Sequence, residues 1–94
     1  MQRLPEDVVR TALVELPRWR GDGAAIAASF AFDSWEAGVA FAMQVALLAQ
    51  RADHHPEIAI GWRRVTVTYT THDAGGVTSH DLAGARAVDA IAPR

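Results

Sequence analysis

Residues 63–71 read Arg-Arg-Val-Thr-Val-Thr-Tyr-Thr-Thr, and apolar and polar side chains alternate along them. Val65, Val67 and Tyr69 share one parity, and the intervening threonines share the other. Because successive side chains of a β-strand point to opposite faces of a sheet, this stretch predicts a strand with an apolar face and a threonine face. His72 continues the threonine parity, so a regular strand would carry it to the threonine face.

The residues before this strand predict two more, and a hairpin turn indicates a further one. Glu57–Trp62 forms a short strand that ends just before it. Ala24–Phe32 forms a longer one, in which alternate large or apolar residues share one parity: Ile26, Ala28, Phe30 and Phe32. Trp19-Arg20 leads into that strand through Gly21-Asp22-Gly23, a sequence typical of a hairpin turn.

Three helices are predicted around these strands. The first covers residues 4–16, where apolar residues recur at helical spacing. The second runs from the N-cap Ser34 to about Arg51. Thr78 caps the third, and Asp81 at its N3 position gives a spacing close to a capping box.

The element order is therefore helix, two strands, helix, two strands, helix. Ninety-four residues are enough for one domain, and no linker or repeat divides residues 1–94. We predict an α+β fold, with a four-stranded antiparallel sheet and the helices packed on one of its faces.

The second helix carries apolar residues on two sides. One stripe contains Trp35, Val39, Met43, Ala46 and Leu47, and the other contains Phe41, Val45, Leu48 and Ala52. A helix that is apolar on two sides is packed on two sides, so a homodimer or homotetramer is predicted, with Val45 and Leu48 facing outward. The alternative is that an alanine-rich helix is mildly apolar and needs no partner.

Composition excludes several classes of protein. A net charge of −2 with no basic run argues against nucleic acid as a partner. The longest nearly apolar run, residues 37–49, is shorter than the roughly 20 residues that span a membrane, and the first residues lack the apolar core of a signal peptide. A cytoplasmic protein without membrane contact is predicted. The absence of cysteine excludes thiolate metal sites and cysteine nucleophiles.

Histidines gather in the middle of the chain. His54 and His55 are adjacent and precede Pro56, His72 ends the main strand, and Asp81 follows nine residues later. Imidazole titrates near neutral pH, so it can donate and accept a proton within one turnover. Pro56 fixes its own φ and biases His55 toward an extended conformation, which stiffens the presentation of the pair.

Other roles compete with acid–base chemistry. The histidine pair could interact with the last carbonyls of a helix, and Asp81 alone could serve only as a capping partner. His80, in the first turn of the third helix, is predicted to lie at the surface without a role. Three imidazoles could also bind zinc, although neighbours in an extended segment point opposite ways and no helical pair with i, i+4 spacing is present.

These motifs resemble the pterin-4a-carbinolamine dehydratase family. The resemblance covers about residues 13–92, without gaps from His54 to Asp81. It rests on Asp53-His54-His55-Pro56-Glu57, the aromatic Trp62, Val65-Thr66-Val67-Thr68-Tyr69-Thr70-Thr71-His72, Gly75-Gly76-Val77-Thr78 and Asp81, and upstream on Trp19, Phe30-Ala31-Phe32-Asp33-Ser34-Trp35 and Ala40-Phe41-Ala42-Met43. Gln50 departs from the family pattern, since many members carry glutamate there, and Ala59-Ile60-Gly61 is lighter than usual.

The resemblance implies a dehydratase that uses no cofactor, because the pterin is its substrate. The implied catalytic residues are His54, His55, His72 and Asp81, with Asp81 orienting or polarising a histidine. The implied pterin-binding residues are Asp53, His54, His55, Thr70, Thr71, His72, Asp73 and Trp62. A protein-binding module that docks through the second helix is the alternative function, and a histidine metal site is the third.

Overall fold

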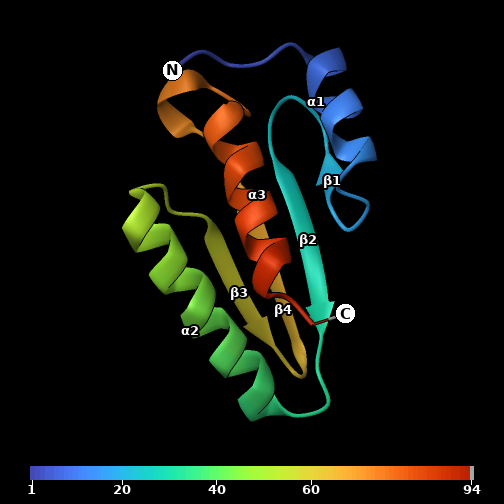
Figure 1. Cartoon of the computed structure of the whole chain (residues 1–94), viewed down its shortest axis with the longest axis vertical. Helices are drawn as coiled ribbons and strands as arrows, with labels where there is room; N and C mark the ends of the chain where they lie inside the picture. The colour runs from blue at the N-terminus through green and yellow to red at the C-terminus, as the bar shows by residue number, and fades with distance from the viewer. Residues whose placement is uncertain (94) are drawn as a thin grey trace.

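The computed structural model describes residues 1–93 and contains three α-helices and four strands (Figure 1). The helices are α1 (Glu6–Val14), α2 (Trp35–Ala52) and α3 (Ser79–Ile91). The strands are β1 (Arg20–Gly21), β2 (Ile26–Ala31), β3 (Glu57–Gly61) and β4 (Arg64–Tyr69), and a short 3₁₀ helix, η1, covers His72–Ala74. The predicted order of helices and strands is confirmed.

The strands form one antiparallel sheet in the order β1-β2-β4-β3. The register of β2 and β4 places Ile26 opposite Tyr69, Ala28 opposite Val67 and Phe30 opposite Val65, and all six side chains are buried. Residues of the other parity remain partly or fully exposed. The sheet therefore has one covered face, and α2 and α3 lie across it in Figure 1.

Local signals set the helix ends. Ser34 accepts a hydrogen bond from the amide of Ala37 and so caps α2. Thr78 and Asp81 form a reciprocal capping box at the start of α3, as their spacing predicts. α2 ends at Asp53, which has a left-handed backbone with φ of 53° and directs the chain into the His54-His55-Pro56 segment.

The strand predicted over residues 63–71 ends two residues early, so the regular strand that would have carried His72 to the threonine face is not present. The strand ends at Tyr69, Thr71 makes only an isolated bridge to Gly76, and the chain then turns through η1. The hydroxyl of Thr70 donates to the carbonyl oxygen of Ala24 at 2.7 Å, which ties the end of the strand to the loop before β2. His72 therefore does not occupy the next position of the threonine face.

The prediction that Val45 faces outward is also wrong. Val45 is 0% exposed and belongs to the core between α2 and the sheet, and Leu48 is only partly exposed. The outward stripe of α2 instead contains Trp35, Met43 and Leu47, which are 45%, 60% and 57% exposed. α2 still has two apolar sides, but the sequence alone assigned the inner and outer sides incorrectly. No helix within residues 1–93 is long and apolar enough to cross a membrane.

Candidate functional site

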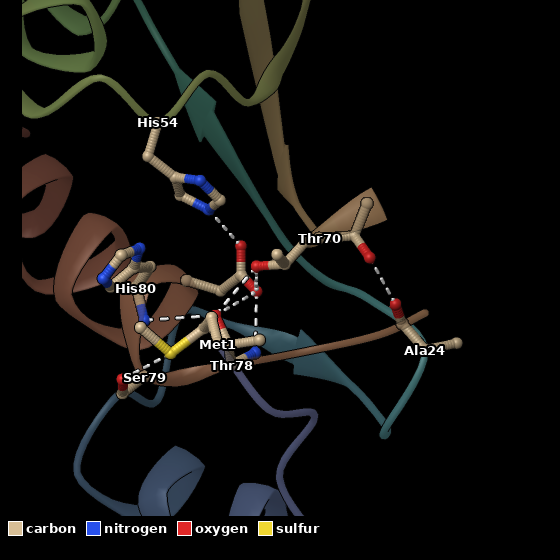
Figure 2. A network of polar contacts seen from close by, with 9 residues as sticks. Met1, Ala24, His54, Thr70, Thr78, Ser79 and His80 are labelled. Carbon is tan, nitrogen blue, oxygen red and sulfur yellow. Dashed lines mark hydrogen bonds and ion pairs between the residues drawn. The ribbon is translucent and has the colours of Figure 1, made fainter. Parts of the chain in front are cut away.

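His54 and Asp81 form the centre of the candidate site. The Nε2 atom of His54 lies 2.5 Å from Oδ1 of Asp81, across 27 residues of sequence. Figure 2 shows the ring of His54 directed away from its loop and into this polar network. The side chain of Asp81 is fully buried, and that of His54 is 17% exposed. The pair is thus formed by the segment after α2 and the first turn of α3.

The second oxygen of Asp81 is held by residues around the start of α3. Oδ2 accepts hydrogen bonds from the hydroxyl of Thr71 at 2.7 Å and from the amide of Thr78 at 2.8 Å. Asp81 is therefore both the capping residue of α3 and the partner of His54. These two roles, which the sequence presented as competing explanations, coexist in one carboxylate because its two oxygens serve different donors.

Two aromatic side chains flank the His54 ring. Tyr69 stacks on it, with 5.6 Å between ring centroids and 16° between planes. The ring of His80 lies edge-on to that of His54, with 5.7 Å between the ring centroids, and Figure 2 shows the two side by side. His80 is exposed, as predicted, but it contacts the candidate site. Among the predicted histidines, His54 is therefore held by three neighbours that fix its orientation.

A cleft of about 160 Å³ opens beside this histidine, between α2 and α3. His54, Tyr69 and His80 form its polar end. Small and apolar side chains line the rest: Leu48, Ala52, Ala83, Gly84 and Ala87. We refer to it as the α2–α3 cleft.

The other predicted histidines lie at the border of the site. Nε2 of His55 is 2.9 Å from Oε1 of Gln50, so the family-atypical glutamine holds this ring. His72 is exposed in η1, directly after Thr71, which contacts Asp81. Within residues 1–93, no group of three or more His, Asp or Glu side chains is arranged to hold a metal ion.

The predicted pterin-binding residues divide into two groups. Asp53 directly precedes His54, and Thr71 and Asp73 flank His72 in η1. Thr71 also contacts Asp81 on α3. Trp62 does not: it lies in the turn between β3 and β4, at the opposite end of the hairpin from His54, and is 73% exposed. Within one copy of the chain, Trp62 is not part of the site. The hydroxyl of Thr70 is directed to Ala24 instead of the histidines, as Figure 2 shows.

A larger hollow, of about 400 Å³, lies along β2. It is lined by Arg18, Arg20 and Arg64 together with β2 residues, and it contains none of the predicted site residues. Size alone therefore does not select the candidate site, which we place where hydrogen bonds converge on Asp81.

Sequence reasoning missed Tyr69, His80 and Gln50 as neighbours of the histidines. Tyr69 has the parity of the core valines, which indicated only a buried residue. The one signal in the sequence was Gly84, a glycine inside the predicted third helix. A Cβ atom at Gly84 would lie 2.5 Å from Cζ of Tyr69, so α3 can cross the ring only where glycine stands.

The environment of Tyr69 predicts alkaline sensitivity. Burial raises the pKa of the Tyr69 phenol above its ordinary value of 10.0, and the Asp81 carboxylate raises this pKa further. Above about pH 10 the unfolded chain loses this proton while the folded chain retains it. Stability is therefore complete below pH 10 and is lost as the pH rises from there through the folded-state pKa.

We expect the midpoint of urea denaturation to fall between about pH 9 and pH 11 more steeply in the wild type than in Tyr69→Phe. Tyr69 is the only tyrosine, so absorbance of its phenolate also reports the titration directly. Parallel declines of the two midpoints would contradict the assignment.

Relatives of this chain match it over nearly its whole length. A profile of the family described as "Pterin 4 alpha carbinolamine dehydratase" matches residues 2–91. A protein of Nocardia farcinica that carries the name "putative pterin-4-alpha-carbinolamine dehydratase" is 43% identical over 89 residues, covering 95% of this chain and 94% of its own. One of the same name from Natronomonas pharaonis is 44% identical over 90 residues, covering 96% of each chain.

Two solved structures are similar in fold. A transcriptional coactivator/pterin dehydratase from Brucella melitensis superposes with a TM-score of 0.90 at 41% identity, over 98% of this chain and 100% of that one. A pterin dehydratase-like protein identified as a RuBisCO assembly factor in the alpha-carboxysome has a TM-score of 0.63 at 28% identity, over 78% of this chain and 84% of that one. The chain thus belongs to the pterin-4a-carbinolamine dehydratase family.

Proposed function

We propose that this protein eliminates water from 4a-hydroxytetrahydropterin by histidine acid–base catalysis, giving quinonoid dihydropterin for tetrahydropterin recycling in the cytoplasm. In this reaction the bond between C4a and the hydroxyl oxygen breaks, N5 loses its proton, and a double bond forms between C4a and N5. The leaving hydroxyl takes up a proton and departs as water. The reaction needs one group that donates a proton and one that accepts a proton, and imidazole can do both.

His54 is the proposed acid at the 4a-hydroxyl. Its Nε2 is engaged by Asp81, whereas Nδ1 makes no hydrogen bond within residues 1–93 and is left for the substrate. Asp81 is a positioning residue, because it acts through His54 and is itself fully buried. A histidine whose second nitrogen is held by a carboxylate keeps one orientation, which is what proton transfer over a fixed distance requires.

The remaining roles follow the family resemblance. His72 is proposed to assist hydroxyl departure from the other face of the ring, and His55 to contact the pterin and accept the N5 proton. Asp53, Asp73 and the backbone of residues 70–73 would line the pterin. Trp62 is left out of the single-chain site because of its position in the β3–β4 turn.

One observation carries the proposal. A chain of the dehydratase family brings a histidine of its His-His-Pro motif within 2.5 Å of a buried carboxylate that lies 27 residues away. Thr71 and Thr78 also donate to that carboxylate and fix it. Capping of α3 alone requires no histidine partner, so the pair indicates a chemical role.

The alternative function is a protein-binding module. The exposed stripe of α2, formed by Trp35, Met43 and Leu47, is a specific observation in its favour. Contact between copies of this chain in a homodimer or homotetramer accounts for the same stripe. A purely binding role would leave the His54–Asp81 pair without a use, so the dehydratase is preferred.

The proposal is tested by adding purified protein to freshly generated 4a-hydroxytetrahydropterin, after dialysis against a chelator. We expect dehydration well above the spontaneous rate, and we expect the same rate before and after chelation, because the proposed groups are side chains. Histidine ligands would instead make activity depend on bound metal. An undialysed protein that gave no acceleration would rule out the dehydratase. Loss of activity on chelation that zinc restores would favour the metal site.

A further inference from the structure

The first residues of the chain contact the turn of residues 75–77, which joins η1 to α3 (Figure 1). The amide of Leu4 donates to the carbonyl oxygen of Val77 at 2.8 Å. Nη1 of Arg3 donates to the carbonyl oxygen of Gly75 at 2.9 Å, across 72 residues of sequence. Figure 2 shows Met1 close to the start of α3. The N-terminal segment therefore lies beside the turn that separates two of the proposed catalytic residues.

The side chain of Arg3 also packs against two buried glycines. A Cβ atom at Gly76 would lie 2.6 Å from Nε of Arg3, and one at Gly23 would lie 2.9 Å from Nη2 of Arg3. A side chain on either glycine would therefore displace the guanidinium group. No carboxylate holds this group in place, because the ion pairs formed within residues 1–93 join other residues. The contacts of Arg3 are thus directed to the backbone of the turn.

The turn needs contacts from outside itself to keep one conformation. Gly75 has a φ of 74°, a left-handed conformation that glycine adopts without strain, and Gly76 follows it. Glycine loses more conformational freedom on folding than any other residue, so a pair of glycines is costly to order. Arg3 meets this need at both positions, by its hydrogen bond to Gly75 and by packing against Gly76.

The same turn is hydrogen-bonded to residues of the candidate site. The amide of Gly75 donates to the carbonyl oxygen of His72 at 3.0 Å. Gly76 and Thr71 exchange two backbone hydrogen bonds, of 3.1 and 3.3 Å. Thr71 also donates to the buried carboxylate of Asp81 at 2.7 Å. A contact that fixes Gly75 at its carbonyl group therefore supports, through its amide, the backbone of His72.

We propose that Arg3 is a positioning residue for the dehydratase reaction, acting through Gly75 on His72. The inference rests on the proposed function, in which His72 assists departure of the 4a-hydroxyl. Proton transfer is efficient only when the donor is held close to its reactive geometry. His72 is exposed in a 3₁₀ helix of three residues, so its placement depends on the backbone that carries it. Arg3 itself does not contact the substrate in this proposal.

The test compares the rates of Arg3→Ala, Arg3→Lys and the matched control Arg10→Ala. In folded Arg3→Ala we expect kcat to fall about three- to tenfold, the effect of one lost hydrogen bond, with KM changed by less than about twofold. Lysine keeps the charge but lacks the planar group that packs between the glycines, so Arg3→Lys should give an intermediate kcat. Arg10 is exposed on α1 and pairs only with Glu6, so Arg10→Ala removes a positive charge without touching the turn and should match the wild type.

Two further measurements separate positioning from general stabilisation of the fold. Amide hydrogen exchange at Gly75 and Gly76 should become about three- to tenfold faster in Arg3→Ala, while exchange at Val67 in β4 stays unchanged. In the His72→Ala background, Arg3→Ala should lower kcat by less than about twofold, because the side chain that Arg3 positions is absent.

Three results would overturn the role of Arg3 while leaving the dehydratase intact. They are a wild-type kcat in folded Arg3→Ala, an undiminished effect of Arg3→Ala in the His72→Ala background, and a wild-type kcat in His72→Ala alone. If Arg3→Ala does not fold, Arg3→Lys decides in its place, and a wild-type kcat in that variant would overturn the role. Wild-type protein that is inactive would instead reject the proposed function, and the positioning role with it.

Discussion

His54→Ala is expected to lower kcat by about 10²–10⁴-fold, which is the range that a positioned acid or base contributes. The fold should persist, because the side chain of His54 is partly exposed and Asp81 keeps its bonds from Thr71 and Thr78. Stopped-flow measurement of carbinolamine dehydration gives kcat, and circular dichroism confirms the fold.

His72→Ala separates one proton path from two. If His54 and His72 act on opposite faces of the ring, the double variant should lose more activity than either single variant; if they share a proton path, it should lose no more than the worse one. His55→Ala should instead raise KM, because its proposed role includes ground-state contact with the pterin.

Arg51→Ala is the matched control for these variants. Arg51 is exposed in the last turn of α2, only three residues before His54, and has no assigned part. His80 is unsuitable for this purpose because its ring contacts that of His54. Folded His54→Ala that dehydrates the substrate as fast as Arg51→Ala would remove His54 from the mechanism.

The parts of the fold that follow from local physics could be predicted. Alternation in residues 65–69, the N-cap Ser34 and the capping box of Thr78 and Asp81 each depend on a few neighbouring residues. The sequence carries these signals directly, because a strand has a period of two and a helix end has orphan amides to satisfy. The proximity of His54 to Asp81 was foreseen only through the family resemblance.

The errors arise where tertiary contacts override the local pattern. His72 lies outside the strand because the chain turns at Thr71, which bridges to Gly76. The alternation of residues 65–71 does not predict this turn. Tyr69 reads as one more core residue, and only the fold shows that its ring reaches His54 and Gly84. On α2, both apolar stripes satisfy a helical period, so burial against the sheet, and not periodicity, decides which is inside.

The two sides of α2 predict opposite outcomes for the same substitution. Val45→Asp places a carboxylate at a position that is 0% exposed, in contact with the core. Burying an unpaired charge is one of the few changes that can cost about 4–5 kcal/mol or more, against about 5–15 kcal/mol of stability for a whole domain. We expect Val45→Asp to be unfolded or aggregated, with a lost or strongly lowered thermal transition by circular dichroism.

Leu47→Asp should leave the monomer folded, because Leu47 is 57% exposed and exposed substitutions usually change stability by about 0.5 kcal/mol or less. If the α2 stripe joins copies of this chain, the same charge should dissociate them. A symmetric contact contains the substitution twice, once from each copy, and each aspartate is then buried against an apolar surface. Sedimentation at micromolar concentration measures whether the copies have dissociated.

Gln44→Asp adds the same charge at an exposed polar position of the same helix and should alter neither fold nor assembly. A wild-type monomer at that concentration would remove the homo-oligomer from the explanation of the stripe and leave a different protein partner as the remaining one.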